Sequence, residues 1–510
     1  MLNWFSLCYL ILSLKSKLLK IMKKLFSILL ILSISLAGLS QNNSYKIKMK
    51  INGMKDSTCY IINYLGQNRF YKDTAQFNND GVIIFKGEEQ HPGGMYTLFT
   101  GTKILFDFII NNEELIDLET DTIDFIGNMK IKSSNENKVF FDRQKFITKK
   151  REDSQALREK LNAKETSDIE KEELNKEFTI MGQAVSAYDS NIIKTNPTLF
   201  MSVFLKLMKE PETPDYNEIE NDSIKKLMKY EYYKNHFFDD VDFSDSRINY
   251  TPFYHQKLDK YFKNVIYPMP DSIINGVDYI LNKAKANDDI FQYSVQTLFN
   301  KYIKSKIMGM DAVYAHIGEK YYTYDLAFWS DSAQIEKIQE QSRKLAPLLL
   351  GKQAINLSLL DTGNNWVNMY KDVKAEYTVL VFWEASCGHC KKELPKLARY
   401  IDSVKTTVDI KVYSVSKNHD DEWKKFIRDN NLDFVNVAVP KEVYSDQQKA
   451  TEYIRNGFTD LKSLNYNTTY DIFTTPQIYL LDKDKKIIGK KLETGLLKKI
   501  IKKEEAIKKR

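Results

Sequence analysis

The fold of the C-terminal part of this chain is decided by residues 382–390, which read FWEASCGHC. The residues that lead into this stretch, 377–383, are apolar and rich in β-branched and aromatic side chains, which predicts a strand. Residues 391–400, KKELPKLARY, predict a helix directly after the second cysteine. Cys387 would then lie at a helix N-terminus, where free N–H groups and the helix dipole favour a thiolate over a thiol. Strand, dithiol and helix in this order are what thiol redox chemistry needs.

A Cys-x-x-Cys pair serves either as half of a zinc site or as a redox pair. A zinc site needs about four ligands, usually from a second Cys-x-x-Cys or a histidine pair. The chain has four cysteines, and neither Cys8 nor Cys59 forms a second pair. The sequence therefore predicts a redox-active Cys387–Cys390 pair, no metal and no other cofactor. Cys59 is expected to be a buried strand thiol, with a regulatory or intermolecular disulfide as the alternative.

Length and composition indicate a globular protein of several domains. A chain of 510 residues is too long for one core, and about three domains are expected. It is 43% hydrophobic and 28% charged, and its net charge of +7 implies no nucleic-acid partner. The lysine-rich residues 485–510 predict a solvated amphipathic helix, with a role at a membrane surface or toward an acidic partner as the alternative.

The N-terminus has the pattern of an export signal over residues 1–40. Residues 22–24, MKK, are a short basic segment, residues 25–36 are apolar, and the small residues 37–40 favour cleavage before Gln41. Met22 is the expected start, with the preceding residues as upstream sequence or an extended basic region. The apolar run is too short to span a bilayer comfortably, so no membrane span is expected after cleavage. An uncleaved N-terminal anchor is the alternative.

Three domains are predicted after the signal. Residues 41–134 contain short segments in which apolar and polar residues alternate, a pattern typical of strands, and residues 79–81, NDG, are a hairpin signal. Together they predict an antiparallel β-sandwich or barrel. Residues 135–345 have helical periodicity and predict an all-α domain. Its aromatic cluster at residues 230–238 is expected to be core packing, with a peptide groove as the alternative. Residues 346–510 alternate strands and helices, which predicts an α/β domain.

The C-terminal third resembles the TlpA/ResA-like thiol-disulfide oxidoreductases of the thioredoxin family. The resemblance is carried by Phe382-Trp383 before the dithiol, Pro395 in the following helix, Thr475-Pro476, and the strand and turn at residues 477–484. It covers residues 345–495 and implies a thioredoxin-like fold. The β-rich and helical regions resemble, more weakly, the accessory domains that precede such domains in exported proteins of envelope-bearing bacteria. The resemblance thus implies a location in the periplasm or cell envelope.

The resemblance and the chemistry together imply a role for each residue of the site. Cys387 is expected to attack a client disulfide and Cys390 to resolve the mixed disulfide. His389 is expected to stabilise the Cys387 thiolate. Thr475 and Pro476, with a cis peptide bond, would pair with an extended substrate chain. The expected partners are protein or peptide thiol and disulfide clients and an unidentified electron donor or acceptor.

Two positions depart from the thioredoxin pattern. Ser386 stands where thioredoxins have a tryptophan, which leaves Trp383 as the expected substrate-binding aromatic. Val381 stands where thioredoxins have a buried acid. Glu384 could transfer protons in its place through a water molecule, or it could be a solvent-facing loop acid.

Two other functions are open from the sequence. A peroxiredoxin-like peroxidase shares the fold, but the residues before Cys387 lack the proline and threonine of the peroxidase site. A binding or scaffold protein could carry the dithiol as a structural disulfide. An inert disulfide of that kind would have a reduction potential below about −300 mV.

Overall fold

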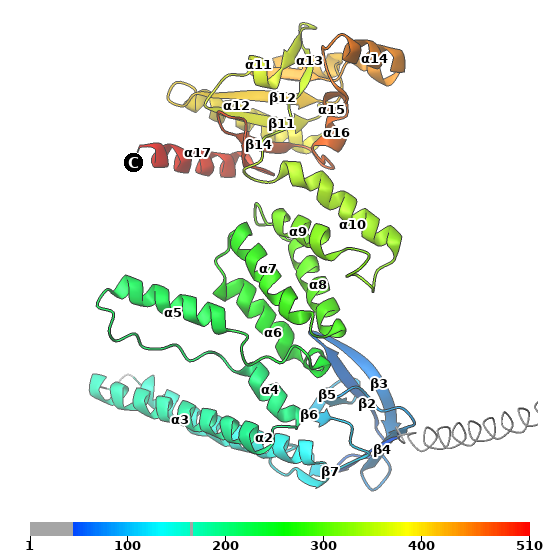
Figure 1. The fold of residues 1–510 in the computed structure, drawn as a ribbon, viewed down its shortest axis with the longest axis vertical. Coiled ribbons are helices and arrows are strands. Elements are labelled where there is room, and N and C mark those ends of the chain that lie inside the picture. The colour runs from blue at the N-terminus through cyan, green and yellow to red at the C-terminus, as the bar shows by residue number, and fades with distance from the viewer. Residues whose placement is uncertain (1–43, 164–166, 510) are drawn as a thin grey trace, which may run out of the picture. The chain divides into compact units, whose positions relative to one another are not determined.

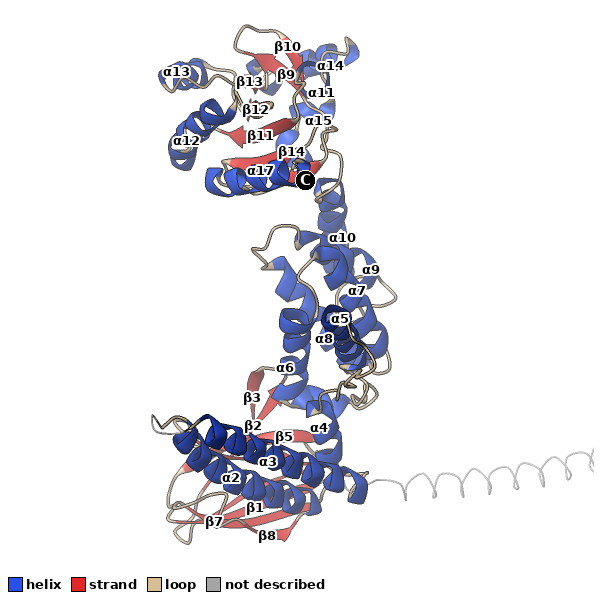
Figure 2. Ribbon diagram, turned by 90° about the vertical axis from the view of Figure 1, so that its left-hand side faces the viewer, coloured by secondary structure: helices blue, strands red, loops and turns tan. Residues whose placement is uncertain are grey.

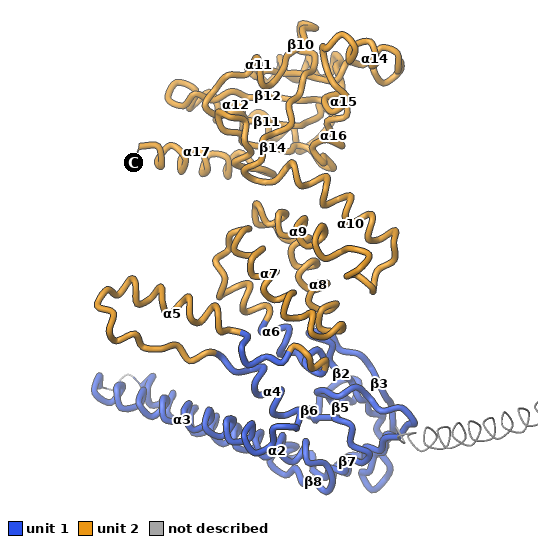
Figure 3. The backbone as a smooth tube through the Cα atoms, viewed as in Figure 1, with its two compact units in different colours: residues 1–210, 238–242, 247–257 blue, residues 211–237, 243–246, 258–510 orange. Residues whose placement is uncertain are grey.

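The computed structural model describes residues 44–163 and 167–509, so the predicted export signal lies outside the described residues. Figure 1 labels the elements, and Figure 3 shows the two compact units into which the chain divides. Unit 1 comprises the described residues up to 210 together with 238–242 and 247–257, and unit 2 comprises the remainder. None of the helices in the described ranges is long and apolar enough to cross a membrane.

Unit 1 contains two four-stranded sheets with the orders β4-β1-β7-β8 and β3-β2-β5-β6. One hydrophobic core contains side chains from both sheets, including Ile47, Ile61 and Leu98, so the sheets face each other as a sandwich, as predicted. One pairing is parallel, between β1 and β7, and the others are antiparallel. The strands are β1 (Tyr45–Asn52), β2 (Thr58–Leu65), β3 (Asn68–Gln76), β4 (Val82–Gly87), β5 (Gly94–Phe99), β6 (Ile104–Ile110), β7 (Leu115–Asp121) and β8 (Lys130–Ser133).

The hairpin predicted at residues 79–81 is wrong in its pairing. The turn forms, and Gly81 adopts a φ of 73° that favours glycine. The strands on its two sides pair with different partners, β3 with β2 and β4 with β1. The Ile51 N–H donates to the Gly81 carbonyl at 2.8 Å, and Phe77 is buried in the core between the sheets. The turn therefore connects the two layers of the sandwich.

Three helices complete the main part of unit 1: α2 (Asn135–Leu161), α3 (Asp168–Thr195) and α4 (Phe200–Met208). The Asn137 side chain accepts from the Ile109 N–H at 2.9 Å and donates to the Ile109 carbonyl at 2.8 Å, which ties α2 to β6. The buried Glu136 carboxylate accepts from the N–H groups of Phe200 and Met201 at 2.6 and 3.2 Å. Two neighbouring residues of α2 thus fix a sheet edge and the start of α4.

Residues 222–348 are helical, as predicted for this part of the chain. The helices are α5 (Asp222–His236), η1 (Ser246–Tyr250), α6 (Pro252–Lys260), the π-helical turn η2 (Tyr261–Val265), α7 (Pro270–Ala284), α8 (Asp288–Ile303), α9 (Asp311–Tyr321), α10 (Ser332–Leu345) and η3 (Ala346–Leu348). Phe237 and Phe238 of the predicted aromatic cluster are buried, whereas α5 itself has no buried residue. Tyr230 lines a cavity with Tyr261 and Tyr279.

The C-terminal part of unit 2 is a seven-stranded mixed sheet of order β10-β9-β13-β12-β11-β14-β15. Strand β11, inside this sheet, runs parallel to β12 and antiparallel to β14. The strands are β9 (Ser358–Asp361), β10 (Trp366–Asn368), β11 (Tyr377–Trp383), β12 (Ile410–Ser416), β13 (Val435–Ala438), β14 (Gln477–Leu481) and β15 (Ile487–Gly489). Every residue of β11 is buried, because both faces of the sheet are covered.

Helices cover the two faces of this sheet, as Figure 2 shows. On one face, Val379, Val381 and Trp383 pack with residues of α12 and α17. On the other face, Leu380 and Phe382 pack with residues of α11 and α16. The helices are α11 (Met369–Asp372), α12 (Gly388–Val404), α13 (Asp421–Asp429), η4 (Lys441–Tyr444), α14 (Gln447–Arg455), α15 (Leu461–Leu464), α16 (Tyr466–Thr469) and α17 (Thr494–Lys508).

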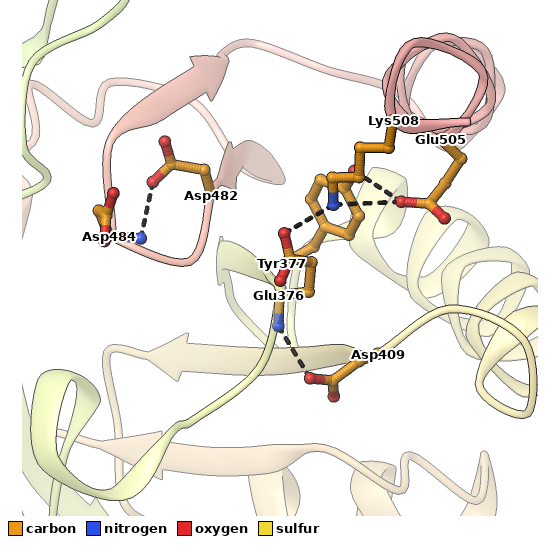
Figure 4. A network of polar contacts seen from close by, with 7 residues as sticks. All are labelled: Glu376, Tyr377, Asp409, Asp482, Asp484, Glu505 and Lys508. Atoms are coloured by element: carbon orange, nitrogen blue, oxygen red, sulfur yellow. Dashed lines mark hydrogen bonds and ion pairs between the residues drawn. The ribbon is translucent and has the colours of Figure 1, made fainter. Parts of the chain in front are cut away.

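The C-terminal helix α17 is attached to the start of β11 by a polar network (Figure 4). Lys508 forms ion pairs with Glu376 at 2.6 Å and Glu505 at 3.3 Å, and its ammonium lies 4.3 Å from the centre of the Tyr377 ring. The Tyr377 hydroxyl donates to Glu505 at 2.9 Å. Leu497 is buried against the sheet. The predicted amphipathic helix forms over Thr494–Lys508, and its apolar face belongs to the core of this domain. The preceding part of the lysine-rich segment departs from the prediction, since residues 487–489 form β15 and Lys485 and Lys490 are buried.

Candidate active site

The dithiol lies where β11 ends and α12 begins. The Cys387 N–H donates to the Glu384 carbonyl at 3.1 Å, which closes the turn after the strand. Cys387 is the N-cap of α12, and its sulfur accepts a hydrogen bond from the Cys390 N–H at 3.3 Å. An N-cap is usually an oxygen-bearing side chain that satisfies a free N–H group of the first turn. Here a sulfur takes that position, so the helix N-terminus acts directly on the Cys387 sulfur.

The two cysteines have opposite environments. Both are free thiols in this structure, with Cys387 half-buried and Cys390 completely buried. Burial by itself would raise the pKa of Cys387, but hydrogen bonds from Cys390, from the Thr475 side chain and from backbone N–H groups outweigh it and lower that pKa. Burial, followed by the neighbouring Cys387, raises the pKa of Cys390 to about 12. The accessible sulfur is thus the one that ionises first.

Thr475 and Pro476 lie beside Cys387, although 88 residues separate Thr475 from that cysteine in the chain. The peptide bond between Thr475 and Pro476 is cis. The Thr475 carbonyl accepts a hydrogen bond from the Cys387 Sγ at 3.3 Å. Pro476 leads into β14, which pairs with β11. The sheet pairing therefore brings the two separate motifs of the sequence to one place.

The substrate-binding role predicted for Trp383 is wrong. Its side chain is fully buried in the core on the α12 face, and the indole N–H donates to Ser414 Oγ of the neighbouring strand at 2.6 Å. The indole ring lies against Phe426, with 5.2 Å between ring centres. A side chain in this position presents no surface to a client. Trp383 supports the strand that carries the dithiol.

Glu384 is the first residue after β11, and its charge acts on Tyr466, which packs in the core cluster of Phe382. Phe382 stacks on Tyr466 with 5.3 Å between ring centres, and the charge of Glu384 helps to keep the pKa of Tyr466 raised, after burial. Among the groups that influence the pKa of Cys390, Glu384 contributes through its backbone. This geometry gives no support to Glu384 as the proton-transfer residue.

His389 and Val381 complete the predicted set. His389 is exposed on the first turn of α12, and its backbone N–H contributes to the lowered pKa of Cys387. Val381 is completely buried in the same core cluster as Cys390. A valine cannot exchange a proton with the buried thiol.

Across residues 44–163 and 167–509, no group of His, Cys, Asp or Glu side chains is arranged to hold a metal ion.

The sequence reasoning missed a layer of tyrosines that holds the Thr475-Pro476 segment. Tyr470 is completely buried and its hydroxyl donates to the Ile355 carbonyl. The Tyr479 hydroxyl donates to the Tyr470 carbonyl at 3.3 Å and accepts from Gln477 at 2.8 Å. Burial, first among several causes, raises the pKa of Tyr470 far above its usual range, so this hydroxyl stays neutral. The aromatic spacing of Tyr466 and Tyr470 was the signal available in the sequence.

The mixed sheet, the dithiol at the start of α12 and the cis-proline segment beside it define the C-terminal domain as a thioredoxin-like oxidoreductase domain. Residues 350–490 match the model of the AhpC/TSA family, and this domain belongs to that family. The thioredoxin-family relationship predicted from the sequence is confirmed. Residues 183–345 and 45–140 each match a model described as a domain of unknown function. No curated protein matches the chain.

Several solved structures are similar to parts of the chain. A domain of a possible thiol-disulfide isomerase from Cytophaga hutchinsonii is 35% identical, and the match covers 32% of this chain and 99% of that one, with a TM-score of 0.26. A thioredoxin-like protein from Bacteroides caccae is 16% identical over 58% of this chain and 98% of that one, with a TM-score of 0.41. The C-terminal domain of a putative thiol-disulfide oxidoreductase from Bacteroides thetaiotaomicron is 24% identical over 30% and 94%, with a TM-score of 0.24.

Proposed function

We propose that this protein is an exported thiol-disulfide oxidoreductase that exchanges disulfides with protein or peptide clients in the cell envelope through Cys387 and Cys390. The observation that carries the proposal is the contrast between the two sulfurs. Cys387 is accessible and its pKa is lowered, whereas Cys390 is buried with a pKa of about 12. An attacking thiolate and a protected resolving thiol need these two environments. The proposed export rests on the apolar residues 25–36 and the small residues after them.

The exchange would proceed in two displacements. The Cys387 thiolate attacks one sulfur of a client disulfide, a mixed disulfide forms, and the other client sulfur leaves as a thiolate. Cys390 then attacks the Cys387 sulfur, the second client sulfur leaves and takes up the proton that Cys390 loses, and a Cys387–Cys390 disulfide remains. The client has gained two electrons and the dithiol has lost them. A donor dithiol restores the Cys387–Cys390 dithiol and itself becomes a disulfide, and the same steps in reverse would oxidise a client.

The client chain would lie along the Thr475-Pro476 segment. The Thr475 carbonyl is 3.3 Å from the Cys387 sulfur, so it is placed to accept a hydrogen bond from the backbone of an extended client. His389 is exposed and directly precedes Cys390 in the chain. Its side chain would stabilise the negative charge of the Cys387 thiolate. A Cys-Gly-His-Cys site of this kind is expected near the potential of disulfide isomerases, about −180 mV, rather than that of thioredoxin, about −270 mV.

The test is to trap the mixed disulfide. Cys390→Ser removes the resolving thiol, so full-length protein expressed with its N-terminus should accumulate adducts through Cys387 in an envelope fraction. Cys387→Ser is the matched control and should accumulate none. The reduction potential of the Cys387–Cys390 pair is measured in parallel. No adducts together with a potential below about −300 mV would favour the structural-disulfide alternative and end the proposal.

A further inference from the structure

One large apolar side chain is exposed next to the dithiol and is used by no step above. Phe473 is 82% exposed, which is the highest exposure among the large hydrophobic side chains described in unit 2. It lies two residues before Thr475, whose carbonyl contacts the Cys387 sulfur. Two residues of chain span at most about 7 Å. The phenyl ring is therefore held within reach of a chain bound at Cys387.

The backbone that carries Phe473 is fixed at both ends. On one side, Tyr470 is completely buried, and the Asp471 carboxylate accepts from the Gln341 amide at 3.2 and 3.3 Å. On the other side, the buried Gln477 begins β14. Aromatic side chains on a fixed backbone bind with little loss of conformational freedom, and for this reason they serve as anchors in interfaces. Phe473 has the position and the support of such an anchor.

The surroundings of Phe473 select the chemistry of what it would bind. Residues 472–476, IFTTP, carry no charge. On the other side of the dithiol, Ser386 is small and exposed, so the position before the first cysteine offers no aromatic contact. With Trp383 buried, Phe473 is the exposed aromatic side chain on the segment that adjoins Cys387. An uncharged, extended polypeptide with an apolar side chain near its cysteine would fit this segment.

We propose that Phe473 is a specificity-determining residue that binds an apolar side chain of the client polypeptide a few residues from the client cysteine. The inference rests on the proposed thiol-disulfide exchange and adds to it the class of client. It assigns to the Thr475-Pro476 loop the aromatic contact that the residue before Cys387 does not supply. Selection by Phe473 acts on the affinity for the client chain and leaves the chemistry of the two sulfurs unchanged.

The experiment measures how fast the reduced protein reacts with each of three disulfide probes. Two are short peptides whose single cysteine carries a thionitrobenzoate disulfide, flanked in one peptide by leucines and in the other by serines. The third is the symmetric small-molecule disulfide of the same thiol, which has no peptide chain. Release of the coloured thiol gives the second-order rate constant for each probe. The matched control is Phe328→Ala, because Phe328 is also a well-exposed phenylalanine of unit 2.

Phe473→Ala is expected to slow the reaction with the leucine-flanked peptide about tenfold. This factor corresponds to the free energy gained when much of one apolar side chain is buried. The serine-flanked peptide and the small disulfide should change less than about twofold. Phe473→Leu should keep most of the rate with the leucine-flanked peptide, and Phe328→Ala should keep all of it.

Equal rates of Phe473→Ala and the wild type with both peptides would overturn the inference. Equal slowing with all three probes would also overturn it, since it would mean that Phe473 only supports the loop. If the wild type reacts with no probe faster than free cysteine does, the proposed function itself fails and this inference fails with it. The small disulfide thus separates the two failures.

Discussion

The Thr475 hydroxyl can be removed with little change in shape, which tests how the Cys387 sulfur is activated. Its hydrogen bond is one of the interactions that lower the pKa of Cys387 against the opposing effect of burial. A hydrogen bond to a charged group contributes about 1.5–3 kcal/mol. Cys387 is partly exposed, so water replaces some of this interaction in Thr475→Val, and about 1–1.4 kcal/mol is the expected loss. This corresponds to a five- to tenfold smaller ionisation constant of the Cys387 thiol.

The assay follows the ultraviolet absorbance of the thiolate in the reduced protein as the pH is raised. Burial raises the pKa of Cys59 to about 11, and the pKa of Cys390 is about 12, so of the described cysteines Cys387 alone titrates below both. Because the pKa of Cys387 is lowered, its thiolate appears first as the pH rises and the signal then reaches a plateau. Thr475→Val should move this rise to higher pH, and alkylation at a pH below the rise should slow in proportion.

The matched control is Thr474→Val, which makes the same change at an exposed neighbour. This variant should titrate as the wild type does. If Thr475→Val and the wild type have the same titration curve, or if Thr474→Val shifts the curve equally, the Thr475 hydroxyl does not stabilise the thiolate. The explanation of the lowered pKa would then have to rest on the Cys390 thiol and the backbone N–H groups at the N-terminus of α12.

Other substitutions test the framework and the alternative chemistry. Trp383→Phe removes the donor to Ser414 and is expected to lower the free energy of unfolding by about 1–3 kcal/mol in urea titrations; no change would mean that this buried hydrogen bond is replaced. Asn137→Ala leaves both polar groups of the Ile109 backbone unpaired and should cost about 2–4 kcal/mol in the same measurement, and a loss below 1 kcal/mol would contradict the role given to that amide. Lys508→Met should cost at most about 1 kcal/mol, and the loss should vanish at high salt because the ion pairs are largely exposed; a loss unaffected by salt would show that packing dominates. Peroxide should oxidise the reduced dithiol no faster than it oxidises an ordinary thiolate, and rapid turnover would favour the peroxidase alternative.

Strand β11 and the dithiol could be predicted because their sequence signal is local. A run of buried apolar residues, a Cys-x-x-Cys and a helix-forming segment follow one another without interruption. The strand pairing predicted from the turn at Gly81 is wrong, because turn residues indicate the local backbone conformation and not the partners of the strands on either side. Those partners depend on Ile51 and Phe77, which the turn sequence does not reveal. The same limit applies to the parallel pairing of β1 with β7.

The errors at the site have a related cause. In β11 every residue is buried, so hydrophobicity cannot show which side chains reach the surface. The substrate-binding role predicted for Trp383 is wrong for this reason, since its side chain lies in the core. The tyrosine layer around Tyr470 depends on contacts with residues more than a hundred positions away, such as Ile355, which no local pattern contains.

The amide of Asn137 has a consequence for how this protein behaves at high concentration. Strand β6 is the last strand of its sheet, and the unpaired groups of a terminal strand are a template to which another chain can add. At Ile109 both groups are already bound by the Asn137 side chain, which imitates a neighbouring strand with the two functions of one amide. A second molecule would have to displace a buried side chain of α2 before it could extend the sheet there. One asparagine thus protects this edge at Ile109 against strand addition in the folded protein.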